Sequence, residues 1–488
     1  MKFGGTSLGD RQRIDTVVSL VRQRRERSPV LVCSAHSGIT DLLLEGARRA
    51  AAGNPDLGPV RSREQVVLEA LGLDISIVEE DLERLDQMFR GLALLGELTP
   101  RSLDAVASFG ERMSVRAIAT VLRRRRLPAT PVMADEAGLV TDSRYTRAAP
   151  RPEAYTNLRA ALAAVEGIPV VTGFIGRDRD GNVTTLGRSG SDFTATIVGK
   201  AIGAEEVEIW TDVSGVLTAD PRLVPEARPV ASLTYAEASE LAYYGAKVIH
   251  PATIQPAVEA RIPVRILNTM DPAAAGTVIA PTRPRAAHEV ASIASKNDIT
   301  LVNVTSGRML GQSGFMAQVF EVFQRHDVVV DLIATSEVSV TVSVDERERL
   351  DDVIEDMKRF GKVSVTEGNA LVAVIGERMR QASGLAGRVF QALAEAKVPI
   401  RAISYGATKT NLQIVVPTER GGDTVRALHA VLFPPPYAAY SPRTERALLA
   451  SAASSSASMA SSRLRGATRS SWPPLCTTAA ETGRLARP

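Results

Sequence analysis

The chain has 488 residues, of which 44% are hydrophobic and 23% are charged, so it is long enough for two or three soluble domains with buried cores. Seven Arg and two Glu follow Tyr440, so the net charge of +3 becomes −2 when residues 1–440 are taken alone. This balance gives no support to a nucleic-acid or membrane partner, and no apolar run reaches the roughly 18 residues that span a bilayer. The only cysteines, Cys33 and Cys476, suggest no disulfide framework and predict a cytoplasmic protein.

The stretch Lys2-Phe3-Gly4-Gly5-Thr6-Ser7 combines a lysine with two glycines. Phe3 suggests the end of a buried strand, and the glycines leave room for backbone N–H groups to approach a phosphate. The lysine precedes the glycines, unlike its place in the common nucleotide-binding loop. These residues predict an anion site, and an ordinary tight turn is the alternative interpretation.

Short apolar segments alternate with helical patterns along the first half of the chain. Strands are predicted at residues 30–33, 130–133, 168–172, 207–210 and 264–267, and helical patterns cover residues 63–95 and 102–124. This alternation predicts an open, mostly parallel α/β sheet sandwiched by helices. In such a sheet the loop at residues 34–40 reaches the same edge as the loop after Lys2.

A second glycine-rich stretch, at residues 184–192, is typical of a strand, a glycine turn and a helix. Ser191 or Asp192 is predicted to be the N-cap. The side chains of Arg188 and Asp192 would then lie beside backbone N–H groups that are unpaired at a helix start. A purely structural capped turn is the alternative.

An internal repeat follows the Ala-, Gly- and Pro-rich residues 273–285. Residues 313–333 match residues 383–403 at a constant offset of 70, and each copy has the size and order of a ferredoxin-like βαββαβ module. The chain is therefore divided into domains at residues 1–285, 286–435 and 436–488. The last segment lacks hydrophobic periodicity and is expected to be disordered, as a linker or as a product of another reading frame.

Both glycine-rich stretches and five further segments, at residues 34–40, 109–112, 210–212, 220–222 and 245–251, resemble the aspartate kinases of the amino-acid-kinase superfamily. The resemblance runs from Lys2 to about Phe433. It implies transfer of the γ-phosphoryl group of ATP to the β-carboxylate of L-aspartate, which gives 4-phospho-L-aspartate. It also implies that the paired repeats are two ACT domains, which bind effectors.

The resemblance assigns roles to individual residues. Lys2 and Asp192 would be catalytic, and the aspartate site would comprise Thr40, Glu111, Arg188 and Ser191. ATP would contact Lys2, Phe3, Gly4, Gly5, Thr211, Asp212, Arg222 and Lys247, with Mg²⁺ arriving on ATP and no metal site of the protein's own.

Arg188 is expected to hold the substrate α-carboxylate, since a guanidinium pairs bidentately with a carboxylate. Glu111 is expected to receive the α-ammonium group. Pairing of Glu111 with Arg112 or Arg116 on a helix surface is the alternative.

Two segments of the first repeat resemble the lysine-inhibited branch of the family. The implied effector site comprises Met309, Gly314, Phe315, Met316, Val330, Asp331, Ser336 and Glu337, in which Asp331 would hold the effector ammonium group. Lysine inhibition is expected, with threonine as the alternative effector. A homodimer, or a dimer of dimers, is expected to form through the ACT domains.

The N-terminal segment departs from the family pattern, because family members normally have several apolar residues before the lysine. A start codon assigned too late would explain this departure; if the protein begins at Met1, the first strand is expected to be truncated, with Lys2 on a fraying end and the activity in question. Two other functions compete: a different carboxylate kinase of the same fold, or a non-catalytic ACT-type amino-acid sensor. Lys2, Glu111, Arg188 and Asp192 argue against the sensor.

Overall fold

The computed structural model describes residues 1–244, 251–283, 288–309, 313–345, 347–380, 382–405 and 410–434. Met1–Phe433 form one compact unit. The predicted tail at residues 436–488 and the predicted boundary at residue 285 lie outside the described residues, so both stay predictions.

The first sheet contains eight strands in the order β3-β4-β2-β1-β7-β9-β10-β8. The strands are β1 (Lys2–Phe3), β2 (Leu31–Cys33), β3 (Ala129–Val132), β4 (Ile168–Thr172), β7 (Val207–Thr211), β8 (Ser232–Thr234), β9 (Val264–Asn268) and β10 (Thr277–Ala280). Only β9 and β10 pair antiparallel within this sheet, so the prediction of a mostly parallel sheet is confirmed.

Helices cover both faces of this sheet, because alternate side chains of its strands enter two separate cores. In β2, Leu31 and Cys33 join one core and Val32 joins the other. The first core is covered by α1 (Arg11–Gln23), α2 (Ile39–Ala51) and α6 (Phe109–Arg124). The second is covered by α7 (Pro152–Ala163), α8 (Gly190–Ile202), α9 (Tyr235–Tyr243) and α10 (Pro251–Ala260). Burial on both faces explains why the strands are mainly apolar.

Strand β1 lies in the middle of the sheet although it has only two residues. Lys2 is in register with Val32 of β2 and Ile209 of β7, and Phe3 is fully buried. The structure therefore shows a short strand, as expected, but one that is paired on both sides instead of frayed. It delivers Gly4 and Gly5 to the carboxyl edge of the sheet.

A group of helices lies between β2 and β3, as the sequence predicted. It contains α3 (Gly58–Ala70), α4 (Glu79–Leu95) and α5 (Pro100–Ala107). The single helix predicted at residues 102–124 is wrong, because α5 ends before Ser108 and α6 begins after it. Asp104, on α5, accepts two hydrogen bonds from Thr185. The backbone N–H of Thr185 donates to the Asp104 carboxylate at 2.9 Å, and the Thr185 hydroxyl donates at 2.7 Å. Thr185 ends the small hairpin of β5 (Ile175–Arg177) and β6 (Val183–Thr185).

The second sheet contains six strands in the order β12-β13-β11-β14-β16-β15, all antiparallel. They are β11 (Ser292–Thr305), β12 (Ile333–Thr335), β13 (Ser339–Val344), β14 (Lys362–Ile375), β15 (Ala402–Ser404) and β16 (Asn411–Pro417). Their helices are α11 (Phe315–Arg325), α12 (Leu350–Met357), α13 (Leu385–Glu395) and α14 (Thr418–Leu432).

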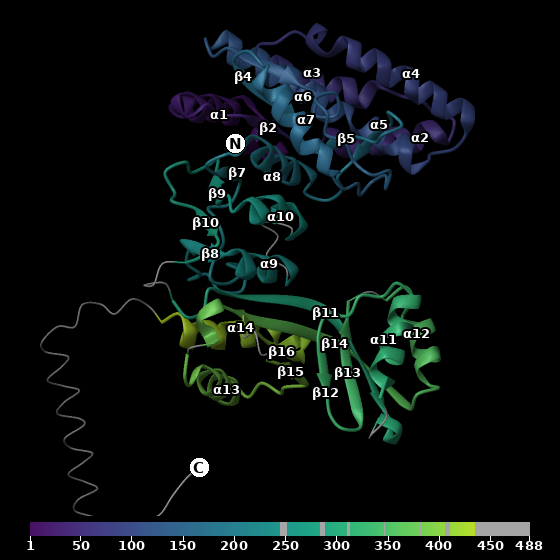
Figure 1. Cartoon of the computed structure of the whole chain (residues 1–488), viewed down its shortest axis with the longest axis vertical. Coiled ribbons are helices and arrows are strands. Elements are labelled where there is room, and N and C mark those ends of the chain that lie inside the picture. Colours follow the sequence, from purple (N-terminus) through teal and green to yellow (C-terminus); the bar gives the residue numbers. More distant parts are fainter. Residues whose placement is uncertain are drawn as a thin grey trace, which may run out of the picture. The chain divides into compact units, whose positions relative to one another are not determined.

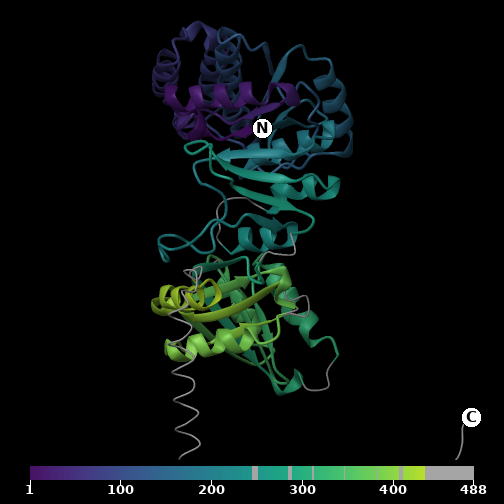
Figure 2. The ribbon, with the colours of Figure 1, turned by 90° about the vertical axis from the view of Figure 1, so that its left-hand side faces the viewer.

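The two predicted repeats share this sheet through its long strands. Figure 1 shows β11 and β14 side by side, with α11 and α12 beside one half and α13 and α14 beside the other. Figure 2 gives the second view, in which α13 and α14 again lie together. Within the described residues, no helix is long and apolar enough to cross a membrane.

Candidate active site

The carboxyl edge of the first sheet carries a pocket that gathers residues from five segments of the chain. It encloses about 260 Å³ and is lined by Lys2, Ser34, Thr40, Glu111, Phe174, Gly187, Ser189, Gly190, Ser191 and Asp192. The loops that follow β1, β2 and β4 meet here because these strands are parallel and adjacent. The structure thus brings together the two predicted catalytic residues with Thr40, Glu111 and Ser191.

Lys2 and Asp192 form an ion pair inside this pocket. The Lys2 Nζ atom lies 2.7 Å from Asp192 Oδ1, and the side chains are only 11% and 12% exposed. Gly4 leaves space for the ammonium group, since a Cβ atom at Gly4 would lie 3.3 Å from it. The pair therefore holds a positive charge at a fixed place beside the glycine loop.

The start of α8 differs from the prediction. The N-cap is Ser189, which has a left-handed backbone with φ of 56°, and not Ser191 or Asp192. Gly190 must pack against Phe174, because a Cβ atom there would lie 2.5 Å from the Phe174 ring. Ser191 and Asp192 consequently occupy the first turn of the helix and line the pocket instead of capping it.

Glu111 is buried without a cationic partner among the described residues. The Ala35 N–H donates to its Oε1 at 3.2 Å, whereas Oε2 has no hydrogen-bond partner there. Burial raises the pKa of Glu111 from 4.5 to about 8. A carboxyl group in this position is suited to receive an ammonium group from a ligand.

The alternative interpretation of Glu111 as a surface carboxylate is wrong. Arg112 pairs with Asp135 at 2.6 Å, and Arg116 pairs with Asp81 at 2.8 Å. Both arginines are thus engaged elsewhere, and neither neutralises Glu111.

Arg188 belongs to the loop that closes the pocket, but its side chain is exposed and does not line the cavity. Its neighbours Gly187 and Ser189 do line it. No ion pair joins Arg188 to another residue within the described ranges. Its guanidinium is therefore available to a ligand at the rim.

The predicted nucleotide residues lie on the neighbouring loops. Gly4 N–H donates to the Trp210 carbonyl at 3.4 Å, so the glycine loop runs beside the end of β7, where Thr211 and Asp212 follow. The Arg222 guanidinium forms hydrogen bonds with the Asp220 carboxylate, the shortest at 2.6 Å. These hydrogen bonds lower the pKa of Asp220. Lys247 lies outside the described residues.

Sequence reasoning missed Ser34, Phe174, Gly187, Ser189 and Gly190 as lining residues. Four of them lie inside motifs that were recognised, so their position in those motifs was a usable signal. No motif contained Phe174. Its left-handed backbone, with φ of 66°, is rare for an aromatic residue and cannot be recognised from the local sequence.

The predicted effector residues lie on three segments of the second sheet and its helices. Gly314 is the N-cap of α11, with Phe315 buried behind it, and Met309, Met316 and Val330 pack against the same core. Ser336 and Glu337 are in the exposed turn between β12 and β13.

Asp331 of the predicted effector site already has partners. The Tyr243 hydroxyl donates to its carboxylate, and the Lys296 ammonium lies 3.5 Å away. Burial raises the pKa of Asp331.

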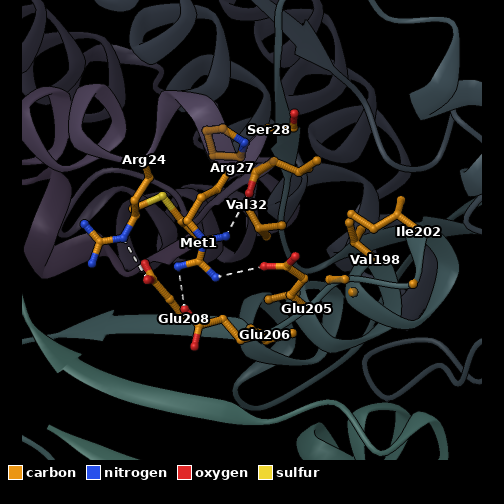
Figure 3. A pocket seen from close by; sticks show the side chains of 17 residues that line it. Met1, Arg24, Arg27, Ser28, Val32, Val198, Ile202, Glu205, Glu206 and Glu208 are labelled. Atoms are coloured by element: carbon orange, nitrogen blue, oxygen red, sulfur yellow. Dashed lines mark hydrogen bonds and ion pairs between the residues drawn. The ribbon is translucent and has the colours of Figure 1, made fainter.

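A larger pocket lies at the opposite, amino edge of the sheet, between the starts of β1, β2 and β7. It encloses about 370 Å³, and Figure 3 shows its arginines turned toward its glutamates. Arg24 pairs with Glu208 at 2.7 Å, and Arg27 pairs with Glu206 at 2.9 Å. Because these cations are already neutralised, this pocket is poorly suited to two anionic substrates.

Comparison with known proteins places the chain in a class. Residues 1–268 match the amino acid kinase family, and residues 302–353 and 372–432 match the ACT domain. The chain therefore belongs to the amino acid kinases, in a form that carries ACT domains.

Closer relatives define the particular family. Aspartokinase 3, chloroplastic, of Arabidopsis thaliana is 37% identical over 89% of this chain and 81% of its own length. Lysine-sensitive aspartokinase 3 of Escherichia coli is 36% identical over 88% of this chain and 98% of its own length. The crystal structure of E. coli aspartokinase III with aspartate and ADP superposes with a TM-score of 0.75 at 35% identity, covering 88% of this chain and 99% of the other. The chain belongs to the aspartokinase family and is an aspartate kinase.

Proposed function

We propose that the carboxyl-edge pocket binds L-aspartate and ATP and joins the β-carboxylate oxygen of aspartate to the γ-phosphorus of ATP. The bond from this phosphorus to the β,γ-bridging oxygen breaks, and ADP and 4-phospho-L-aspartate are released. The observation that carries this proposal is the buried Lys2–Asp192 ion pair, which shares one pocket with the unpaired carboxyl group of Glu111.

The chemistry needs charge neutralisation more than a general base. A carboxylate is already ionised at neutral pH, so no strong base has to activate it. Two anions that approach to 4 Å repel each other by about 4 kcal/mol at an effective dielectric constant near 20. The Lys2 ammonium can offset this repulsion, while Asp192 keeps it oriented toward the glycine loop.

Aspartate would be held at both ends of its amino-acid group. Glu111 would take the α-ammonium and Arg188, at the rim, would close on the α-carboxylate. Thr40 and Ser191, which both line the pocket, would supply hydroxyl groups. This arrangement leaves the β-carboxylate directed at Lys2.

ATP would approach along the glycine loop. Backbone N–H groups near Phe3, Gly4 and Gly5 would face the phosphates, and Thr211, Asp212, Arg222 and Lys247 would hold the remainder. The described residues contain no cluster of three or more His, Cys, Asp or Glu side chains that could hold a metal. Mg²⁺ would accordingly be bound mainly by phosphate oxygens and water.

Lysine is the proposed effector, in line with the lysine-sensitive relative from E. coli. Its ammonium group would replace that of Lys296 beside Asp331, and N–H groups near Gly314 would take its carboxylate. A coupling of about 1 to 3 kcal/mol between this site and the pocket is sufficient for inhibition. Dimers would form through the ACT domains, where β12 is an outer strand with Ile333 45% exposed. A cytoplasmic location is proposed because Cys33 is buried and unpaired.

A hydroxamate assay tests the proposed reaction. ATP, Mg²⁺, aspartate and hydroxylamine should yield aspartyl hydroxamate, glutamate should not, and added lysine should reduce the rate. A pure protein that binds lysine but forms no hydroxamate would support the amino-acid sensor instead.

A further inference from the structure

A second pair of ionisable side chains is buried behind the active-site pocket and has no part in the mechanism above. His36 lies in the loop between β2 and α2, and Glu64 lies on α3. Both side chains are 0% exposed, and the His36 Nδ1 atom lies 2.9 Å from Glu64 Oε1. His36 Nε2 and Glu64 Oε2 have no hydrogen-bond partners among the described residues.

A contribution to the stability of the fold is a weak explanation for the presence of this buried pair. Burial removes both groups from water, and replacing a buried ion pair with apolar residues is often neutral or stabilising. Two polar atoms of the pair have no hydrogen-bond partner in the described part of the chain, which adds to its cost. A buried and costly pair beside a functional loop suggests a positional role.

The pair is half of a clamp between α3 and the loop. The Arg63 guanidinium, next to Glu64, donates twice to the Ser37 carbonyl, at 3.1 Å each. Two consecutive residues of one helix thus hold two consecutive residues of the loop. His36 Nδ1 and Glu64 Oε1 share one hydrogen bond, whose direction depends on the tautomer of the ring, and this bond restricts the orientation of the ring.

The clamped loop is connected to the residues that are predicted to bind aspartate. Ser34, at the start of the loop, and Thr40, in the first turn of α2 just after it, line the pocket. Between them, Ala35 N–H donates to Glu111 and is adjacent in the chain to His36. Movement of His36 would therefore shift both Thr40 and the hydrogen bond that orients Glu111.

We propose that the buried His36–Glu64 pair positions the loop at residues 34–38 and the start of α2, and thereby Thr40 and Glu111, for the binding of aspartate. His36 and Glu64 are positioning residues, since neither lines the pocket. This inference rests on the proposed roles of Thr40 and Glu111. It predicts a larger effect on aspartate than on ATP, because the loop carries Ala35 and leads into Thr40, whereas on the nucleotide side it packs on the glycine loop, at Gly5.

The test compares KM values of purified full-length variants. Glu64→Leu should raise KM for aspartate about tenfold or more and change KM for ATP by less than about threefold. Glu64→Gln should stay within about threefold of wild type, because its side-chain amide can still form a hydrogen bond with His36 Nδ1 in either direction. Glu64→Leu leaves His36 buried without its partner, which can by itself prevent folding. The double variant His36→Leu, Glu64→Leu removes both buried polar groups, so it avoids this problem, and it should show the same rise in KM for aspartate.

A matched control separates position from stability. Asp81→Asn alters another buried carboxylate of the helical group, which pairs with Arg116. It should lower the melting temperature and leave KM for aspartate unchanged. The inference is overturned if the leucine variants keep the wild-type KM for aspartate, if both KM values rise equally, or if Glu64→Gln behaves like Glu64→Leu. Wild-type protein without aspartate-dependent hydroxamate formation would instead overturn the proposed function itself.

Discussion

The two edges of the eight-stranded sheet both carry a pocket with cations and carboxylates, but the charges are arranged differently. At the amino edge, Arg24 and Arg27 are each paired with glutamates. At the carboxyl edge, Lys2 is paired, whereas Glu111 is buried with no cation beside it in the described structure. The charged side chains at the amino edge therefore neutralise one another, whereas Glu111 at the carboxyl edge is suited to a positively charged group of a ligand. The smaller pocket is the better functional candidate for this reason.

The largest expected effect comes from removing the carboxyl-edge cation. Lys2→Met should lower kcat by about 10²- to 10³-fold, because it removes the charge that offsets repulsion between the two anions. Steady-state kinetics at saturating ATP measure this loss. Lys200→Met on α8, which removes an ammonium group paired with Glu259, is the control and should keep kcat. A loss of less than about tenfold in Lys2→Met would contradict the role of Lys2.

The next effect concerns the unpaired carboxyl group. Glu111→Gln should lower kcat/KM for aspartate by about 30- to 300-fold, as expected for the loss of a buried charge-assisted contact, while KM for ATP changes little. Measuring both constants in the same preparation distinguishes this from general inactivation. Equal losses for both substrates would argue against a contact with aspartate.

The raised pKa of Glu111 predicts a pH dependence of aspartate binding. Below about pH 8 the free enzyme carries a protonated Glu111, which has to lose its proton to bind an ammonium group. KM for aspartate should therefore fall by up to about tenfold per pH unit as the pH rises toward 8, and then level off. A flat profile between pH 6 and pH 8 would contradict the assigned contact.

The same group predicts a pH dependence of stability. The pKa of Glu111 is higher in the folded protein than its ordinary 4.5, so its contribution is fully present below pH 4.5 and is lost as the pH rises through about 8. The slope is at most about 1.4 kcal/mol per pH unit. Urea unfolding of wild type and Glu111→Gln should show the variant gaining in relative stability up to about pH 8. An unchanged difference between the two proteins would mean that Glu111 ionises normally.

The smallest effect on activity is expected at the amino edge. The double variant Arg24→Gln, Glu208→Gln replaces a matched ion pair with two neutral amides that can still form hydrogen bonds, and it should change kcat and both KM values by less than about twofold. A large change in any of these constants would show that the amino-edge pocket also serves the reaction.

Much of the fold follows from local patterns in the sequence. Short, mainly apolar segments identify β2, β4 and β7 as buried strands, and the lysine and glycines after Met1 mark the edge where the site lies. These features depend on neighbouring residues, so a single sequence displays them.

The remainder depends on contacts between distant residues. Glu64 lies 28 positions from His36, and Asp135 lies 23 positions from Arg112. No local sequence pattern predicts that these residues are partners. The cap at Ser189 was missed because Phe174 forces the preceding loop into place, and the shared strands β11 and β14 were missed because each repeat alone looks complete.

Proton release on aspartate binding tests the central claim most directly. Titration calorimetry at pH 7, with ADP present and in buffers of different ionisation enthalpy, counts the protons lost per aspartate bound. The account predicts release of about one proton by wild type, since the carboxyl group of Glu111 has to ionise, and almost none by Glu111→Gln. Binding of aspartate by wild type without proton release would contradict it.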